Sequence, residues 1–129
     1  MKLSKNWGLL VMKSEWKVLT VNELIKLGYI EEPLDGNHGS IHPKASDYVS
    51  SGVPFIMANN IINGRVDYNN CAFITQEQAS KLRKGFSKPR DVLLTHKATI
   101  GRTAIVSDEF DTIVLTPQVT YYRVIKGLN

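Results

Sequence analysis

Short apolar runs, each ended by polar, glycine or proline residues, limit what this chain can fold into more than any other feature. The runs are rich in β-branched and aromatic residues and are too short for helices of ordinary length. They occupy residues 55–57, 72–74, 92–94, 103–106, 112–115 and 119–125. Because turn-forming residues separate them, we expect short β-strands connected by loops.

Two segments carry the start signal of a helix. In 20–23 and again in 75–78, a threonine is followed three residues later by a glutamate or a glutamine, which is the spacing of a capping box. The first signal predicts a short helix that ends near Gly28. The second predicts a helix whose last turn, ahead of Gly85, holds the basic residues of 81–84.

A chain of 129 residues, 43% of them hydrophobic, suits one domain with its own core. We therefore expect a single compact α+β domain with a strongly curved, mostly antiparallel β-sheet and two or more short helices. Residues 1–15 are expected to be an N-terminal extension, and residues 16–129 to form the domain. No apolar run approaches the roughly 20 residues of a membrane helix, so no membrane association is expected.

The single cysteine, Cys71, cannot form a disulfide within the chain, and it lies in an apolar, strand-like run. It is therefore expected to be a small core residue rather than a nucleophile. The first 13 residues contain a short apolar patch without the small-residue cleavage site of a secretory signal. These features predict a cytoplasmic location.

Basic residues cluster in the second half of the chain. Seven cations and one acid lie between Lys81 and Arg102, and the rest of the chain has a net charge of −2, against +4 for the whole. Such asymmetry suits a surface that binds phosphates, because clustered cations release counterions from a polyanion. The alternative is a solvated, basic helix end with scattered lysines.

A first loop, residues 32–46, has glycines and prolines at positions that exclude regular helix and central strand. Its polar side chains offer the donors and acceptors that base edges and phosphates require. The candidate contacts are His38, Ser40, His42 and Lys44. A metal site of His38, His42 and Asp47 is disfavoured, because histidines four residues apart converge on one ion only in a helix.

A second segment, 59–65, combines a turn signal with side chains suited to DNA. Asn63-Gly64 predicts a tight turn between apolar flanks. The amides of Asn59 and Asn60 suit adenine, and Arg65 suits guanine or a phosphate. The asparagines fit a structural role equally well, because asparagine tolerates the backbone geometry of turns.

A third segment, 96–102, is a basic loop between two strands that we expect to be buried, 92–95 and 103–106. Rigid strands would hold the loop in place, and Gly101 allows close approach of the backbone to a ligand. The candidate contacts here are His96, Lys97, Thr99 and Arg102. Further along the chain, Gln118 is either a contact or a structural amide.

The motifs of common DNA-modifying enzymes are missing from the sequence. A metal-dependent nuclease needs a carboxylate downstream of Asp91, at the position where this chain has Thr95. A glycine-rich cofactor turn, an Asn/Asp-Pro-Pro-aromatic segment and a phosphate-binding Gly-x-x-x-x-Gly-Lys loop are absent as well. We expect no catalytic residue, no metal site and no cofactor in this chain.

Taken in order, the blocks 35–43, 52–56 and 91–102 resemble the target recognition domain in the specificity (S) subunit of type I restriction-modification enzymes. The resemblance runs from about Trp16 to the C-terminus. It implies sequence-specific binding of double-stranded DNA, with each such domain reading one half of a bipartite target. It also implies partners: modification (methyltransferase) subunits that use S-adenosylmethionine, and restriction subunits that use ATP with magnesium.

Members of this family often have glycine at the positions of Arg90 and Ala98, where this chain departs from the pattern. They usually continue into long spacer helices, which this sequence lacks, so we expect either a fragment of a longer subunit or a stand-alone remnant. Together, the residues and the resemblance predict a DNA reader that is not catalytic by itself. The other candidates are a protein-interaction or inhibitory module that acts on restriction-modification subunits without touching DNA and, least favoured, a small metal-dependent nuclease.

Overall fold

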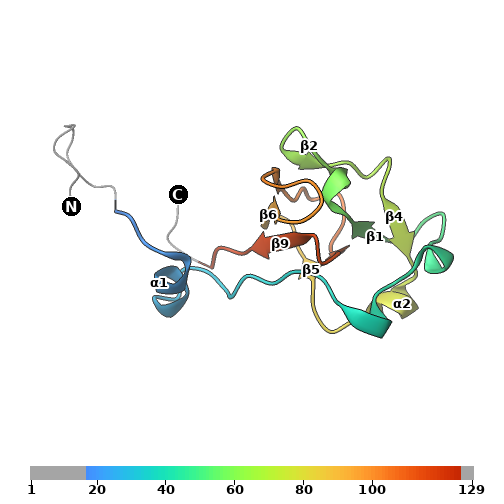
Figure 1. The fold of residues 1–129 in the computed structure, drawn as a ribbon, viewed down its shortest axis with the longest axis horizontal. Coiled ribbons are helices and arrows are strands. Elements are labelled where there is room, and N and C mark those ends of the chain that lie inside the picture. Colours follow the sequence, from blue (N-terminus) through green and yellow to red (C-terminus); the bar gives the residue numbers. More distant parts are fainter. Residues whose placement is uncertain (1–16, 126–129) are drawn as a thin grey trace.

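The computed structural model describes residues 17–125, so the extension expected at 1–15 lies outside the described residues. Within this range the α-helices are α1 (Val21–Lys26) and α2 (Gln76–Ser80), and short 3-10 helices lie at Gly39–Ile41, Ala45–Asp47 and Ala58–Asn60. The strands are β1 (Val53–Ile56), β2 (Ile61–Ile62), β3 (Arg65–Val66), β4 (Ala72–Ile74), β5 (Phe86–Ser87), β6 (Val92–Thr95), β7 (Thr103–Ile105), β8 (Ile113–Leu115) and β9 (Val119–Tyr122). Figure 1 shows these short elements connected by extended loops. Neither of these two α-helices has the length and apolar character of a membrane-spanning segment.

The described strands form three sheets rather than the one that the sequence predicts. A four-stranded sheet has the order β4-β1-β8-β5, a three-stranded sheet has the order β7-β6-β9, and β2 pairs with β3. Most pairings are antiparallel, but β1 and β8 run parallel, which makes the largest sheet mixed. The α+β class with few short helices is confirmed. The strong curvature stays a prediction.

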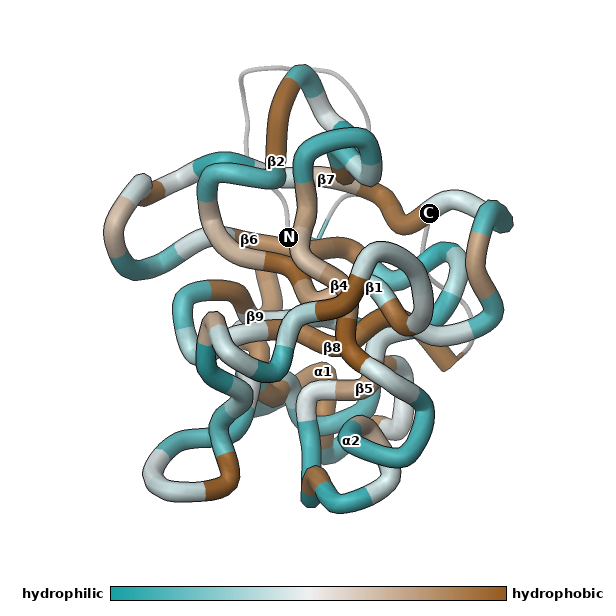
Figure 2. The backbone as a smooth tube through the Cα atoms, turned by 90° about the vertical axis from the view of Figure 1, so that its right-hand side faces the viewer, coloured by the Kyte–Doolittle hydropathy of each residue, from teal (hydrophilic) through white to brown (hydrophobic). Residues whose placement is uncertain are grey.

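Alternating side chains on two central strands build the core on both faces of the four-stranded sheet. In β8, Ile113 and Leu115 join one buried cluster with Ile56 of β1, while Val114 joins another cluster with Phe55. All five are at most 1% exposed. Figure 2 shows the hydrophobic stretches around β1 and β8 in the middle of the molecule. The polar loops therefore extend from a rigid frame.

Both predicted helix starts are confirmed, but α2 ends earlier than predicted. In the capping box of α1, Thr20 Oγ1 accepts from Glu23 N at 3.0 Å, and Glu23 Oε1 accepts from Thr20 N at 2.8 Å. α2 ends before Arg83 and Lys84, which were expected in its last turn. Their backbone N–H groups donate to Asn37 Oδ1, at 2.9 and 3.2 Å, instead of to helical carbonyls. A contact with a distant loop thus shortens the helix.

The segment 103–106, expected to be a buried strand, forms an edge strand with one exposed side. Ala104 is 3% exposed, whereas Ile105 is 61% exposed. β7 pairs with β6 along one edge, and its other edge meets the β2–β3 hairpin at a bridge between Gly64 and Ala104. Because side chains alternate along a strand, one face of such an edge strand remains in solvent.

A buried ion pair ties the start of β6 to the end of β9. Asp91 is 1% exposed and accepts from Arg123 Nε at 2.9 Å and from Arg123 Nη2 at 2.8 Å. The same carboxylate accepts from Ser87 Oγ at 2.8 Å and from Lys88 N at 2.9 Å. Asp91 therefore has a structural role. Its partner Arg123 is 32 residues away in the sequence, and no local pattern indicates the pairing.

Candidate nucleic-acid interface

The β2–β3 hairpin presents exposed polar side chains from the segment 59–65. Its tight turn is confirmed, because Asn63 and Gly64 have φ angles of 53° and 80°, as the favoured two-residue hairpin turn requires. Asn59, Asn63 and Arg65 are exposed. Within the part of the chain that the structure describes, their side chains form no hydrogen bond or ion pair, so they are available to a ligand.

Hydrogen bonds to Thr95 close the loop 96–102 at its base. Thr95 N donates to Arg102 O at 2.9 Å, and Arg102 N donates to Thr95 Oγ1 at 2.9 Å. Gly101 N donates to Thr95 O, also at 2.9 Å. Thr95 is 1% exposed, so the loop is attached to a buried residue while Lys97 stays exposed. A basic loop is thereby held on a rigid base.

Two residues in this half of the chain adopt backbone conformations that favour glycine. Ala98 has a φ of 62° and Arg90 has a φ of 77°, both in the left-handed region. These are the two positions at which the resembled family often has glycine. The chain keeps this conformation without glycine, which costs roughly 1 kcal/mol of strain at each position.

The hairpin and the loop lie side by side. Ile105 N donates to Gly64 O at 3.3 Å, and Arg102 Nη1 donates to Ile61 O at 3.1 Å. A hollow of about 440 Å³ lies between the two segments, lined by Ile61, Ile62, Asn63, Gly64, Arg102 and Thr103. In Figures 1 and 2, β2 and the neighbouring loops occupy one end of the domain. We call residues 59–65 and 96–102 together the hairpin–loop surface.

Three of the predicted contacts in these segments are buried in whole or in part. Asn60 is 4% exposed, its Oδ1 accepts from Met57 N at 2.9 Å, and its Nδ2 donates to Asn70 O at 3.4 Å. The structural interpretation therefore holds for this asparagine. His96 is half-buried, and its Nε2 is buried without a hydrogen-bond partner among the described residues. Thr99 is half-buried as well.

Gln118 connects both segments of the surface to the core. Its Oε1 accepts from Ala58 N at 2.9 Å, just ahead of the hairpin. Its backbone oxygen accepts from His96 N at 3.0 Å, at the start of the loop. Of the two roles left open by the sequence, the structure shows the structural amide.

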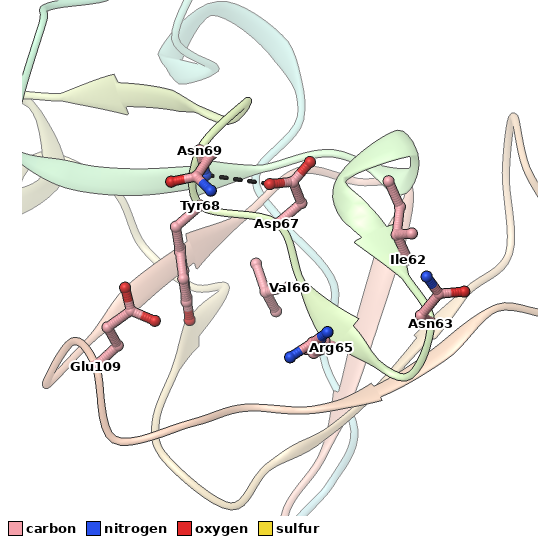
Figure 3. A pocket seen from close by; sticks show the side chains of 8 residues that line it. All are labelled: Ile62, Asn63, Arg65, Val66, Asp67, Tyr68, Asn69 and Glu109. Carbon is pink, nitrogen blue, oxygen red and sulfur yellow. Dashed lines mark hydrogen bonds between the residues drawn. The ribbon is translucent and has the colours of Figure 1, made fainter.

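A second hollow, of about 380 Å³, lies beside the hairpin. Figure 3 shows Arg65 lining it together with two carboxylates, those of Asp67 and Glu109. Asp67 is used within its own turn, where its Oδ1 accepts from Asn69 N at 3.1 Å. Because carboxylates repel phosphates, Arg65 on this side of the hairpin suits a guanine edge better than a phosphate.

The first loop lies away from the hairpin–loop surface, beside α2 (Figure 1). Asn37 anchors it, being 3% exposed and donating from Nδ2 to Lys84 O at 2.7 Å. The ring of His42 packs against Phe55, with ring centroids 5.5 Å apart. Its Nδ1 is buried without a hydrogen-bond partner within residues 17–125. The structure thus uses part of this loop for packing.

His38, Ser40 and Lys44 are the exposed members of the predicted set in the first loop. His38 Nε2 lies 3.5 Å from Asp35 Oδ2, and Lys84 Nζ lies 2.6 Å from Asp35 Oδ1. Partial burial raises the pKa of Asp35, but the hydrogen bonds and charges of Lys84 and His38 outweigh it, so the pKa is lowered from its ordinary value. An acid of the same loop therefore engages these two basic groups.

The basic residues between Lys81 and Arg102 do not form one patch. Lys81, Arg83 and Lys84 follow α2, whereas Lys97 and Arg102 belong to the hairpin–loop surface. In both Figure 1 and Figure 2, β2 lies at the top of the molecule and α2 lies well below it. The clustering in the sequence therefore divides between two regions in space.

A metal site and a thiol nucleophile each place requirements on the described residues. Between residues 17 and 125, no three histidine, cysteine or carboxylate side chains are arranged as metal ligands. Cys71 is half-buried and packs against one of the core clusters. Burial raises the pKa of its thiol, which makes it a poor nucleophile at neutral pH.

No protein-family model matches this chain, and no curated protein matches it. Among solved structures, the chain is similar to the crystal structure of the HsdS subunit from Thermoanaerobacter tengcongensis, with a TM-score of 0.55 at 16% sequence identity. The match covers 76% of this chain and 22% of that subunit, so the chain spans about a fifth of its length. This domain therefore has the fold of part of an HsdS subunit, and the predicted resemblance to the S subunit of a type I restriction-modification system is confirmed as far as the fold.

Proposed function

We propose that this domain binds double-stranded DNA sequence-specifically through the hairpin–loop surface. The observation that supports the proposal best is that hydrogen bonds join two segments, more than 30 residues apart in the sequence, into one polar and basic surface on a rigid base. Four exposed side chains of this surface have no partner in the described structure, namely those of Asn59, Asn63, Arg65 and Lys97. A reader of DNA needs such groups on rigid supports.

Each of these four polar side chains has a matching partner on a DNA duplex. The amides of Asn59 and Asn63 can donate to N7 and accept from N6 of adenine, and Arg65 can donate to N7 and O6 of guanine. Lys97 suits a phosphate, because its ammonium is a compact charge on a flexible stem. His96 and Thr99, both half-buried, stay predicted contacts of the loop.

The four predicted contacts of the first loop, His38, Ser40, His42 and Lys44, would have to meet a different part of the target. The segment that holds them, 38–44, lies beside α2 and away from β2. We therefore assign the primary contacts to the hairpin–loop surface and leave the first loop as a secondary candidate.

In a type I restriction-modification system, such a domain would read one half of a bipartite target. We propose that modification (methyltransferase) and restriction subunits supply all catalysis, in the cytoplasm, and that this domain contributes sequence preference. One half-site offers few base pairs, each worth about 1–3 kcal/mol of discrimination. Useful affinity would then come from several binding sites in one assembly.

A second candidate function is a protein-interaction or inhibitory module without direct DNA contact. Ile100 is 77% exposed within the loop and Ile105 is 61% exposed on the neighbouring strand, which an apolar protein interface would explain. Ionic strength separates the two candidates, because binding to phosphates weakens steeply with salt and an apolar interface does not.

The test is a selection of bound duplexes from a randomised library, followed by anisotropy titrations of the enriched duplex at several salt concentrations. We expect enrichment of one short motif and a binding constant that falls linearly with the logarithm of the salt concentration. A Lys97→Ala, Arg65→Ala double variant should lose most of the binding. Absence of binding even at low salt and high protein concentration would favour the protein-interaction module.

A further inference from the structure

Arg102 differs from the other basic residues of the hairpin–loop surface because its guanidinium is bonded within the protein. Its Nη1 donates to the backbone oxygen of Ile61 at 3.1 Å. Arg65 and Lys97 have no such partner in the part of the chain that the structure describes. Arg102 therefore differs in role from Arg65 and Lys97, although the sequence suggests a DNA contact for all three.

The main chain of Arg102 is fixed as firmly as its side chain. Its N–H donates to Thr95 Oγ1 and its carbonyl accepts from Thr95 N, both at 2.9 Å. Thr95 is 1% exposed. The guanidinium thus extends from a buried support, where both backbone polar groups are already satisfied, to a second segment of the chain.

That second segment is the root of the hairpin. Ile61 is 0% exposed and pairs with Val66 across the hairpin. The tip is joined to β7 through Ile105 N and Gly64 O at a longer distance, 3.3 Å. A hydrogen bond with a charged donor is stronger than a neutral one, so Arg102 provides the firmer of these two links between hairpin and loop.

We propose that Arg102 is a positioning residue, which fixes the hairpin at a set separation from the loop and makes no contact with DNA itself. The inference rests on the proposed function of the surface. Arg102 and Thr103 line one wall of the hollow of about 440 Å³, and Ile62 and Asn63 line the other. The bond between the two walls sets the distance at which Lys97 and the hairpin side chains meet the duplex.

Loss of a positioning residue and loss of a phosphate contact have different effects on DNA binding. Removing a phosphate contact lowers the slope of log Kobs against log salt by about 1 and weakens all sequences alike. Removing a positioning residue releases the hairpin, so it erodes the preference between sequences while the slope changes by less than about half that amount. The two roles can therefore be told apart without knowing the bound geometry.

The experiment compares the full chain with Arg102→Met and Arg102→Ala, and uses Lys97→Ala as the matched control. Arg102→Met retains the apolar stem of the side chain, which guards against loss of packing. Anisotropy titrations of the selected duplex and of a scrambled duplex, over a series of salt concentrations, give the sequence preference and the slope for each variant. Amide hydrogen exchange of Ile105 in the free protein reports whether the hairpin is still joined to β7.

For both Arg102 variants we expect a roughly tenfold loss of sequence preference, a slope change of less than about 0.5 and faster exchange at Ile105. Lys97→Ala should lower the slope and leave Ile105 exchange unchanged. A lowered slope with unchanged exchange in the Arg102 variants would overturn the inference and make Arg102 a phosphate contact. Failure of the unsubstituted chain to bind any duplex would instead overturn the proposed function, so the two failures are distinguishable.

Discussion

The hairpin–loop surface and the first loop, 32–46, are alike in sequence but differ in how the fold uses their side chains. Both are polar and contain glycine. In the first loop, side chains add to the backbone bonds of Leu34 and Gly36: Asn37 bonds to backbone groups beyond α2, and the ring of His42 packs on the core. On the hairpin–loop surface, bonds to Thr95 and Gly64 and the guanidinium of Arg102 hold the two segments together, and the side chains of Asn59, Asn63, Arg65 and Lys97 remain free for a ligand. Polar composition alone therefore does not identify a contact surface.

The largest expected effect is the loss of stability in Asn37→Ala. This change removes the acceptor for two backbone N–H groups and the donor for Lys84 O, which lie at 2.9, 3.2 and 2.7 Å. We expect the free energy of unfolding to fall by about 2–4 kcal/mol, because partly buried backbone groups lose their partners. Urea denaturation followed by circular dichroism measures the change.

The matched control is Asn59→Ala on the hairpin–loop surface. Asn59 is exposed and its side chain has no partner within the described residues, so its removal should change the unfolding free energy by no more than about 0.5 kcal/mol. DNA binding should weaken instead. Equal losses of stability in the two variants would erase the contrast between the regions.

The second prediction compares two exposed lysines, Lys97 of the hairpin–loop surface and Lys44 of the first loop. Lys97→Ala should weaken binding of the selected duplex several-fold, by about 1 kcal/mol, and lower the salt slope by about 1, because one phosphate contact is lost. Lys44→Ala should leave both quantities close to those of the parent chain. Salt-dependent anisotropy measures them, and the reverse order would move the contact surface to the first loop.

The third prediction uses alanine-to-glycine changes in the two regions. Ala98 has a φ of 62°, so Ala98→Gly relieves strain and should raise the unfolding free energy by up to about 1 kcal/mol. Ala45 begins a 3-10 helix and does not have a positive φ, so Ala45→Gly should lower it by about 0.5–1 kcal/mol. Thermal denaturation of the three proteins side by side gives the signs. Stabilisation by both changes would argue against strain at Ala98.

The smallest expected effect is the pH dependence of the Asp35 contacts in the first loop. Burial raises the pKa of Asp35, but the hydrogen bonds and charges of Lys84 and His38 lower it by more, so the pKa lies below the ordinary 3.8. A lowered pKa contributes stability above the ordinary value, and this contribution is lost as the pH falls through the pKa of the folded state. The parent chain should therefore melt slightly above Asp35→Asn at pH 7, with the difference disappearing well below pH 4. A difference that persists at the lowest pH would exclude the charge of Asp35 as its cause.

Local features of this domain could be predicted from the sequence, because each depends on a few adjacent residues. The capping box at Thr20, the turn at Asn63-Gly64 and the strand 72–74 are of this kind. The loop 96–102 between β6 and β7 was also predictable, because two strand-like runs flank it.

Features that join distant residues could not be predicted in this way. The division into three sheets depends on pairings such as that of β1 with β8, and the short α2 depends on Asn37, 46 residues from Arg83. The same limit applies to the candidate site. Sequence patterns predict both Arg102 and Asn60 as DNA contacts. Only the folded structure shows that Arg102 bonds to Ile61 and that Asn60 bonds to Met57 and Asn70.

The most direct test of the central claim is the change of backbone amide NMR signals during titration with the selected duplex. The account predicts that the largest changes fall within 59–65 and 96–102, while the amides of 38–44 and α2 stay close to their free positions. Changes concentrated in 38–44 and α2, with the hairpin–loop surface unaffected, would contradict it.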